Sequence, residues 1–192
     1  LDFQWYPEAC CGKYAFHSLS HFIECEPMPG EEIIGIREYA RAILNTAKTK
    51  GITPIDLAAE IMRAATAAKD EANKISPGSD PELENTLNDI EAMAFLGYYY
   101  GYKILGATHA HLAQIAPYPD IKESNKATAV ENLEKALLAW DKYTEKIKSL
   151  YAPQALTRLI PDNENLQITQ RQINISNFRK NVIDDINTAK NI

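Results

Sequence analysis

The chain has 192 residues, of which 45% are hydrophobic, and it carries a formal net charge of −6 with a pI of about 5.3. This length and apolar content fit one globular domain with its own core. The acidic balance argues against nucleic acid and against an anionic membrane surface as partners, because both attract clustered positive charge.

The chain begins LDFQWYPEAC, without an initiator Met, a basic segment or an apolar segment. We expect that it is not a complete precursor, and that either a signal has been removed or the chain is a piece of a larger protein. Cys10, Cys11 and Cys25 are an odd number of cysteines, and adjacent cysteines rarely bridge each other. Neither a disulfide framework nor a zinc site is expected.

Residues 1–30 differ from the rest of the chain in their aromatic residues, prolines and cysteines. From Tyr14 to Cys25 the residue types alternate, which predicts a β-strand. No second strand follows in the remaining sequence, so we expect the partner of this strand to lie upstream. The predicted organisation is an extended N-terminal segment, 1–30, followed by a helical bundle, 31–192.

Five helices are predicted from the apolar periodicity of the bundle region. The second begins most clearly, since Thr53 suits the N-cap and Pro54 the first turn. Gly51 is expected just after the first helix, and Ser176 at the N-cap of the last. The predicted fold class is all-α, an up-and-down antiparallel bundle of four to five helices with a short extended or strand segment at the N-terminus. The helices are expected at 31–49, 54–75, 81–115, 126–151 and 176–190.

The third predicted helix is nearly free of charge in its second half. Lys103 is the only charged residue between Glu91 and Asp120, with histidine taken as neutral. A helix that is apolar nearly all round is surrounded by other helices, so we expect this one to be central. Lys103 is interpreted as a residue whose ammonium reaches solvent along the helix surface. Three glycines in the same stretch predict close contact with neighbouring helices, because glycine is otherwise unfavourable inside a helix.

A membrane span is the alternative interpretation of this stretch, since a span needs about 20 predominantly apolar residues. Four tyrosines from Tyr98 to Tyr102, two histidines and Lys103 argue against it. No cluster of Lys or Arg flanks the stretch either. No membrane span is expected.

Two groups of side chains in the bundle region invite a functional interpretation. His109 and His111 are two residues apart, so on a helix they point in different directions and cannot share a metal ion. The tyrosines from Tyr98 to Tyr102 surround the third helix, and they suit either packing or a groove that stacks on a sugar. We expect packing, and a core histidine at His111.

The N-terminal segment supplies the candidate ligand-binding residues. They combine aromatic faces, a carboxylate and imidazoles, which suit sugar binding or acid–base chemistry. The other interpretation is a linker whose aromatic side chains pack on the bundle. No catalytic residue, metal ion or cofactor is expected, since no known catalytic or phosphate-binding motif is present. The candidates are Trp5, Tyr6, Glu8, His17 and His21.

Several segments resemble a known group of proteins: LDFQWYPEACCGKY, TPIDLAAEIMRAA, DIEAMAFLGYYYGYKILGA and AVENLEKALLAWDKY. They are similar to the C-terminal helical region of large polysaccharide-degrading proteins of Bacteroides-type gut bacteria, which look like relatives of alpha-glucuronidases. The resemblance implies a periplasmic, cell-surface or secreted protein whose catalytic carboxylates belong to an upstream barrel. It implies that this region braces the barrel, forms a dimer contact or lends an aromatic residue to the rim of the active site.

Two functions follow, from different classes. The first is a non-catalytic accessory domain of a glycoside hydrolase-like protein, with the upstream catalytic domain, a glycan or a second copy as partners. The alternative is a free-standing helical binding or scaffold protein of the periplasm or surface. The unpaired strand and the missing start favour the first. The chain alone is expected not to be an enzyme.

Overall fold

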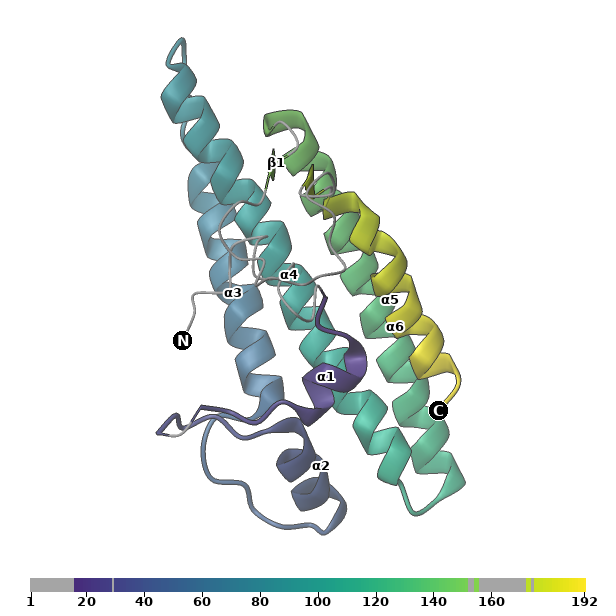
Figure 1. Ribbon diagram of the computed structural model, residues 1–192. Helices are drawn as coiled ribbons and strands as arrows, with labels where there is room; N and C mark the ends of the chain where they lie inside the picture. The colour runs from purple at the N-terminus through teal and green to yellow at the C-terminus, as the bar shows by residue number, and fades with distance from the viewer. Residues whose placement is uncertain (1–15, 29, 152–153, 156–171, 174) are drawn as a thin grey trace.

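The computed structural model describes residues 16–28, 30–151, 154–155, 172–173 and 175–192, and these form an all-α bundle, as predicted (Figure 1). Helices α3 to α6 run alternately up and down in Figure 1, so consecutive long helices are antiparallel. A pair of two-residue strands, β1 and β2, joins antiparallel between α5 and α6. The elements are α1 Leu19–Glu24, α2 Ile36–Leu44, α3 Pro54–Ala72, α4 Pro81–Ile115, α5 Pro119–Leu150, β1 Gln154–Ala155, β2 Gln172–Ile173, a 3₁₀ turn Ile175–Phe178 and α6 Arg179–Lys190.

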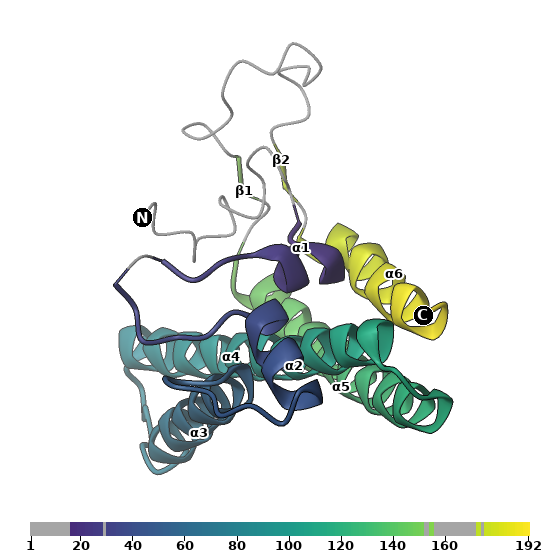
Figure 2. The same ribbon diagram turned by 90° about the horizontal axis from the view of Figure 1, so that it is seen from below.

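Helix α4 is central, as its lack of charge predicted. It contacts α3, α5, α2 and α1, and from Phe95 to Ala113 none of its residues is exposed. Viewed from below, α1 and α6 lie on one side of α4 and α3 on the other (Figure 2). A side chain at Gly101 would meet Met62 Cγ at 2.5 Å and the Ala58 carbonyl at 3.2 Å. Glycine therefore lets α3 and α4 approach closely at this position.

The predicted starts of α3 and α4 are confirmed by their caps. The Thr53 hydroxyl accepts a hydrogen bond from Asp56 N at 3.1 Å, and the Asp56 carboxylate accepts one from Thr53 N, which completes a capping box. The Asp80 carboxylate accepts hydrogen bonds from Glu82 N and Leu83 N. Each cap satisfies backbone N–H groups that have no partner within the helix.

The predicted first helix is much shorter than expected. Ile33 pairs with Ile52 in an isolated parallel bridge, so residues 31–35 are extended and α2 begins only at Ile36. The helix ends at Leu44. Gly51, expected just after it, instead has a φ of +115° where the chain crosses the Glu32 carbonyl closely. Glycine is needed there for the crossing, because any Cβ would collide with that carbonyl.

Two further helix boundaries differ from the prediction. Helix α5 begins at Pro119, seven residues before the expected start, because Pro119 occupies its first turn and Asp120 favours the positive end of the helix dipole. Ser176 does not cap α6, which follows a 3₁₀ turn and has Phe178 at its N-cap. Val182, Ile186 and Ala189 form the buried face of α6.

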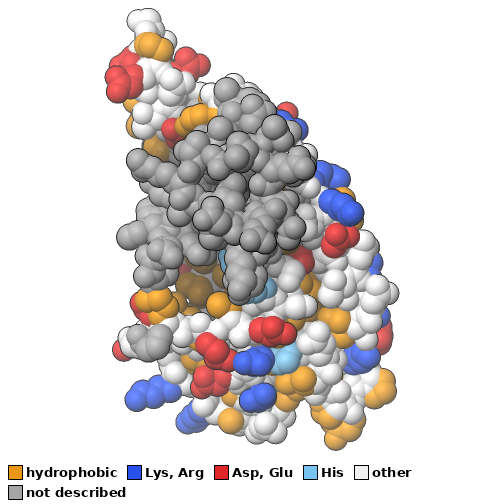
Figure 3. Space-filling model, viewed as in Figure 1, with side chains coloured by type: hydrophobic (Ala, Val, Ile, Leu, Met, Phe, Trp, Pro, Cys, Tyr) orange, Lys and Arg blue, Asp and Glu red, His pale blue; other side chains and the backbone are white. Residues whose placement is uncertain are grey.

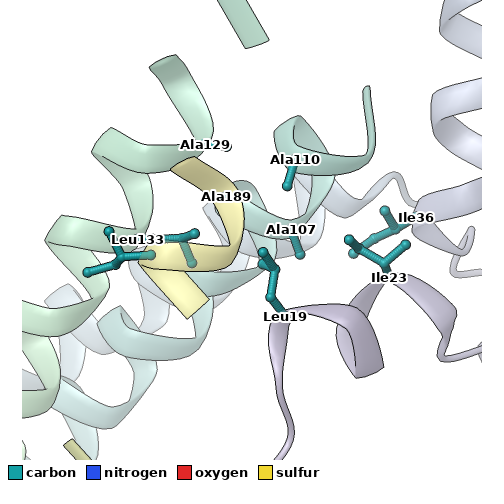
Figure 4. Packing of buried hydrophobic residues seen from close by; sticks show 9 residues of the cluster. Leu19, Ile23, Ile36, Ala107, Ala110, Ala129, Leu133 and Ala189 are labelled. Atoms are coloured by element: carbon teal, nitrogen blue, oxygen red, sulfur yellow. The ribbon is translucent and has the colours of Figure 1, made fainter. Parts of the chain in front are cut away.

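The predicted N-terminal strand is wrong where the structure describes it. Residues Leu19–Glu24 form α1, and Ser18 caps it by accepting a hydrogen bond from His21 N. The spacing of Leu19 and Ile23, four residues apart, places both on one face of this helix. That face is buried in the core, where Leu19 points toward Ala107 of α4 and Ile23 lies beside Ile36 of α2 (Figure 4). Part of the N-terminal segment therefore belongs to the bundle.

No helix in the described ranges is long and apolar enough to cross a membrane.

Candidate functional site

The most unusual side chain in the bundle is Lys103, whose ammonium lies in the interior. Only 1% of the residue is exposed, so the prediction that it reaches solvent is wrong. Its Nζ lies 2.9 Å from Asp185 Oδ2 and donates hydrogen bonds to Tyr99 Oη at 3.0 Å and to the His17 carbonyl oxygen. A buried ammonium needs such partners, because removing a charge from water is costly. We call Lys103, Asp185, Tyr99 and His17 the Lys103 cluster.

Asp185 connects the cluster to α6 and to the start of α1. Its Oδ1 accepts a hydrogen bond from Leu19 N at 2.7 Å, between residues that are 166 positions apart in the sequence. Burial raises the pKa of the Asp185 carboxyl, while the Lys103 ammonium and the Leu19 N–H offset part of that rise. The carboxylate therefore satisfies one N–H of the first turn of α1 and neutralises the Lys103 charge.

Aromatic rings enclose the ammonium. The Lys103 Nζ lies 4.0 Å from the centre of the Phe16 ring and 4.8 Å from that of Phe22, distances at which the ring faces attract a cation. Phe16 in turn stacks on Phe178, and Phe22 on Tyr100. The N-terminal segment thus closes over Lys103 with its rings as well as with its backbone.

Of the five predicted ligand-binding residues, the structure brings His17 and His21 together. Their ring centres are 4.6 Å apart, and the buried His17 Nδ1 has no hydrogen-bond partner among the described residues. Burial lowers the pKa of His17, and the neighbouring His21 and Lys103 lower it further. Trp5, Tyr6 and Glu8 lie outside the described residues.

The other histidines do not form a metal site with each other. His109 Nδ1 pairs with Asn125 Oδ1 at 2.9 Å, and His111 Nδ1 with Gln114 Oε1 at 3.0 Å. Within the ranges that the structure describes, no group of three or more His, Cys, Asp or Glu residues could hold a metal ion.

The tyrosines of α4 make the contacts expected of packing residues. Tyr99 is buried against Trp140, with ring centres 4.9 Å apart. The Tyr98 hydroxyl lies 2.8 Å from that of Thr66 on α3, and the Tyr102 ring faces Lys135 on α5. Each ring is therefore engaged with a neighbouring helix.

A second charged cluster lies nearer the start of α4. Glu91 lies 3.3 Å from Lys69 Nζ on α3 and 2.7 Å from Lys146 Nζ on α5. Its hydrogen bond with Lys146 lowers the pKa of Glu91, burial opposes this, and Lys69 adds to the lowering. The side chain is 31% exposed, so water screens this group, which we call the Glu91 cluster.

Sequence reasoning missed Asp185 and the partners of Glu91. One signal could have found Asp185, because it lies between Val182 and Ile186 on the apolar face of α6. The acid on this apolar face could have been matched with Lys103, the only charged residue between Glu91 and Asp120.

The described part of the face in Figure 3 carries acidic, basic and apolar side chains intermingled below the grey atoms, with no field of a single sign. In comparisons with known proteins, no family model, no curated protein and no solved structure matches the chain. The described residues form a helical bundle with a buried ion pair between Lys103 and Asp185. This pair binds backbone atoms of the chain's own N-terminal segment.

Proposed function

We propose that the chain is a non-catalytic accessory domain of a larger polysaccharide-degrading, glycoside hydrolase-like protein of the periplasm or cell surface. The observation that supports this is that the charged groups of the Lys103 cluster bind the backbone of the chain itself. Its ammonium binds the backbone of residue 17, and its carboxylate binds the backbone of residue 19. A cluster that binds the chain's own backbone serves to hold a segment in place.

The burial of the cluster supports a non-catalytic role. A general acid or base must come within hydrogen-bond reach of a substrate, and Lys103, Tyr99 and Asp185 are all buried beneath the N-terminal segment. Glycoside hydrolysis further requires two carboxylates that face each other across a cleft. Three of the acids on helix surfaces are instead paired with neighbouring basic residues: Glu60 with Arg63, Glu131 with Lys135 and Asp141 with Arg179.

The proposed role is to brace the neighbouring domain or to form a contact between copies. The backbone of residues 17–19 is bound by Lys103 of α4 and by Asp185 of α6. A domain connected through the N-terminal segment would therefore be tied to the most buried helix rather than to a flexible surface loop. The resemblance to the helical region of alpha-glucuronidase-like proteins implies that this neighbouring domain is an upstream catalytic barrel.

The proposal is tested on the encoded polypeptide. We expect its reading frame to place a glycoside hydrolase-like domain before Leu1, and we expect the chain by itself to release no chromophore from a panel of aryl glycosides. In the whole polypeptide, Asp185→Asn should lower the melting temperature of the catalytic domain, whereas the exposed control Glu131→Gln should not.

Two results would contradict the proposal. A reading frame that encodes only this chain after a signal peptide would favour the alternative, a free-standing helical binding or scaffold protein. Turnover by the chain alone, abolished by one Asp or Glu substitution, would show that the domain is catalytic.

A further inference from the structure

The contact between α1 and the bundle contains a histidine in an unusual position. Lys103 holds the carbonyl of His17 itself, and the ring of His17 lies against the ring of His21. The buried Nδ1 of His17 has no hydrogen-bond partner among the described residues. A proton on this nitrogen would place a second positive charge beside Lys103 and leave a buried donor without an acceptor, and both effects are unfavourable.

Among the residues that the structure describes, the charged and titratable groups around His17 do not offset such a charge. From α4 come Lys103 and Tyr99, and Lys103 is a like charge. From α6 comes Asp185, whose two oxygens are engaged by Lys103 and by Leu19 N, with Asp184 next to it in sequence. On α1 itself, His21 is the adjacent titratable group, and toward α2 the acid Glu26 is paired with Arg37.

We propose that His17 makes the docking of α1 pH-dependent, so that α1 is held on the bundle at neutral pH and is released under mildly acidic conditions. Release would uncover Leu19 and Ile23, together with the surface of α4 and α2 on which they pack. This device belongs to the fold, and it does not depend on the role of the domain in a larger protein.

The sign follows from the two states of His17. In the docked state the imidazole has a lowered pKa, whereas after release it returns to an ordinary value of about 6.5. The docked state therefore favours the neutral ring. Its stabilisation is complete above about pH 6.5, and it is lost as the pH falls from there toward the lowered pKa.

Asp185 cannot produce the same effect, because its sign is opposite. Its pKa is raised in the docked state, so its protonated form is favoured there. The stabilisation from this group is present at low pH and is lost as the pH rises through the raised pKa. If the docking of α1 weakens on mild acidification, the protonation of His17 rather than of Asp185 accounts for it.

The experiment measures amide hydrogen exchange of residues 19–24 in the full chain, from about pH 8 to about pH 5, as protection factors corrected for intrinsic rates. We expect protection of α1 to fall below about pH 6.5, by up to about tenfold per pH unit for one proton, while α4 stays protected. His17→Gln keeps the backbone carbonyl that Lys103 binds and should make α1 protection independent of pH. The matched control His111→Gln, on α4, should retain the wild-type dependence.

Direct titration of the His17 ring by NMR in the wild-type chain gives a second readout, which is decisive if the glutamine variant fails to fold. A midpoint below the ordinary value supports the proposal, and a midpoint at or above it overturns it. The proposal is also overturned if α1 protection is flat with pH, or if His17→Gln retains the full dependence.

Discussion

Helix α4 carries two charged clusters, and each joins it to two other elements. The Lys103 cluster connects α4 to α6 and to the N-terminal segment, and it is buried. The Glu91 cluster connects α4 to α3 and α5, and it is partly exposed. The chemistry is similar, but the cost of removing one partner differs, because only the buried cluster would keep an uncompensated charge in the interior. Burial, more than the number of contacts, decides how much each cluster matters.

The largest expected effect comes from breaking the buried pair. Asp185→Leu leaves the Lys103 ammonium without its counter-charge, and we expect a loss of about 3–5 kcal/mol in the free energy of unfolding, measured by urea titration. The double variant Lys103→Met with Asp185→Leu removes both charges and should recover much of that loss. Equal losses in the single and double variants would show that the ion pair is not the source of the effect.

A smaller effect is expected from overpacking the middle of α4. Gly101→Leu forces a side chain against Met62 and the Ala58 carbonyl, so α3 must move away, at a cost of about 1–3 kcal/mol or somewhat more. The matched change Met93→Leu, at a half-exposed position on the same helix, should be nearly neutral. Equal stabilities by denaturant titration would mean that α3 and α4 are not in close contact at Gly101.

The smallest effect is expected at the Glu91 cluster. Glu91→Gln should cost about 0.2–1 kcal/mol, and the cost should shrink at high salt because the group is reached by water. Since the pKa of Glu91 is lowered, its contribution is present above the ordinary carboxyl pKa and is lost as the pH falls through the lowered value. Urea titrations at two ionic strengths measure the cost of Glu91→Gln and its decrease with salt. A loss as large as that of Asp185→Leu would refute the comparison.

The elements with local signals could be predicted from sequence. Thr53 and Asp80 mark the starts of α3 and α4 through their own side chains, and the uncharged stretch of α4 identifies the central helix. The start of α2 could not be predicted, because the bridge between Ile33 and Ile52 depends on a tertiary contact. An alternation of residue types likewise concealed the short helix α1, in which only Leu19 and Ile23 are fully buried.

Only part of the candidate site could be predicted from the sequence. The chemistry of their side chains predicts His17 and His21 as site residues, and both lie at the Lys103 cluster. The sequence around Lys103 predicts an ammonium that reaches solvent, because no acidic residue lies between Glu91 and Asp120. The counter-charge, Asp185, comes from the other end of the chain, and only the packing of α6 brings it to α4.

The hydrogen bond from Leu19 N to Asp185 has a consequence for the order of folding. It joins residues 166 apart, whereas α4 and α5 pack together across a turn of three residues, Ala116–Tyr118. The α4–α5 hairpin can therefore form early from local contacts, and the two ends of the chain meet only when the rest is assembled. Contacts that form late act mainly on how slowly a fold opens. We therefore expect the contact between Leu19 and Asp185 to form last, and to slow unfolding more than it speeds folding. Asp185→Leu should accordingly raise the unfolding rate and leave the folding rate nearly unchanged.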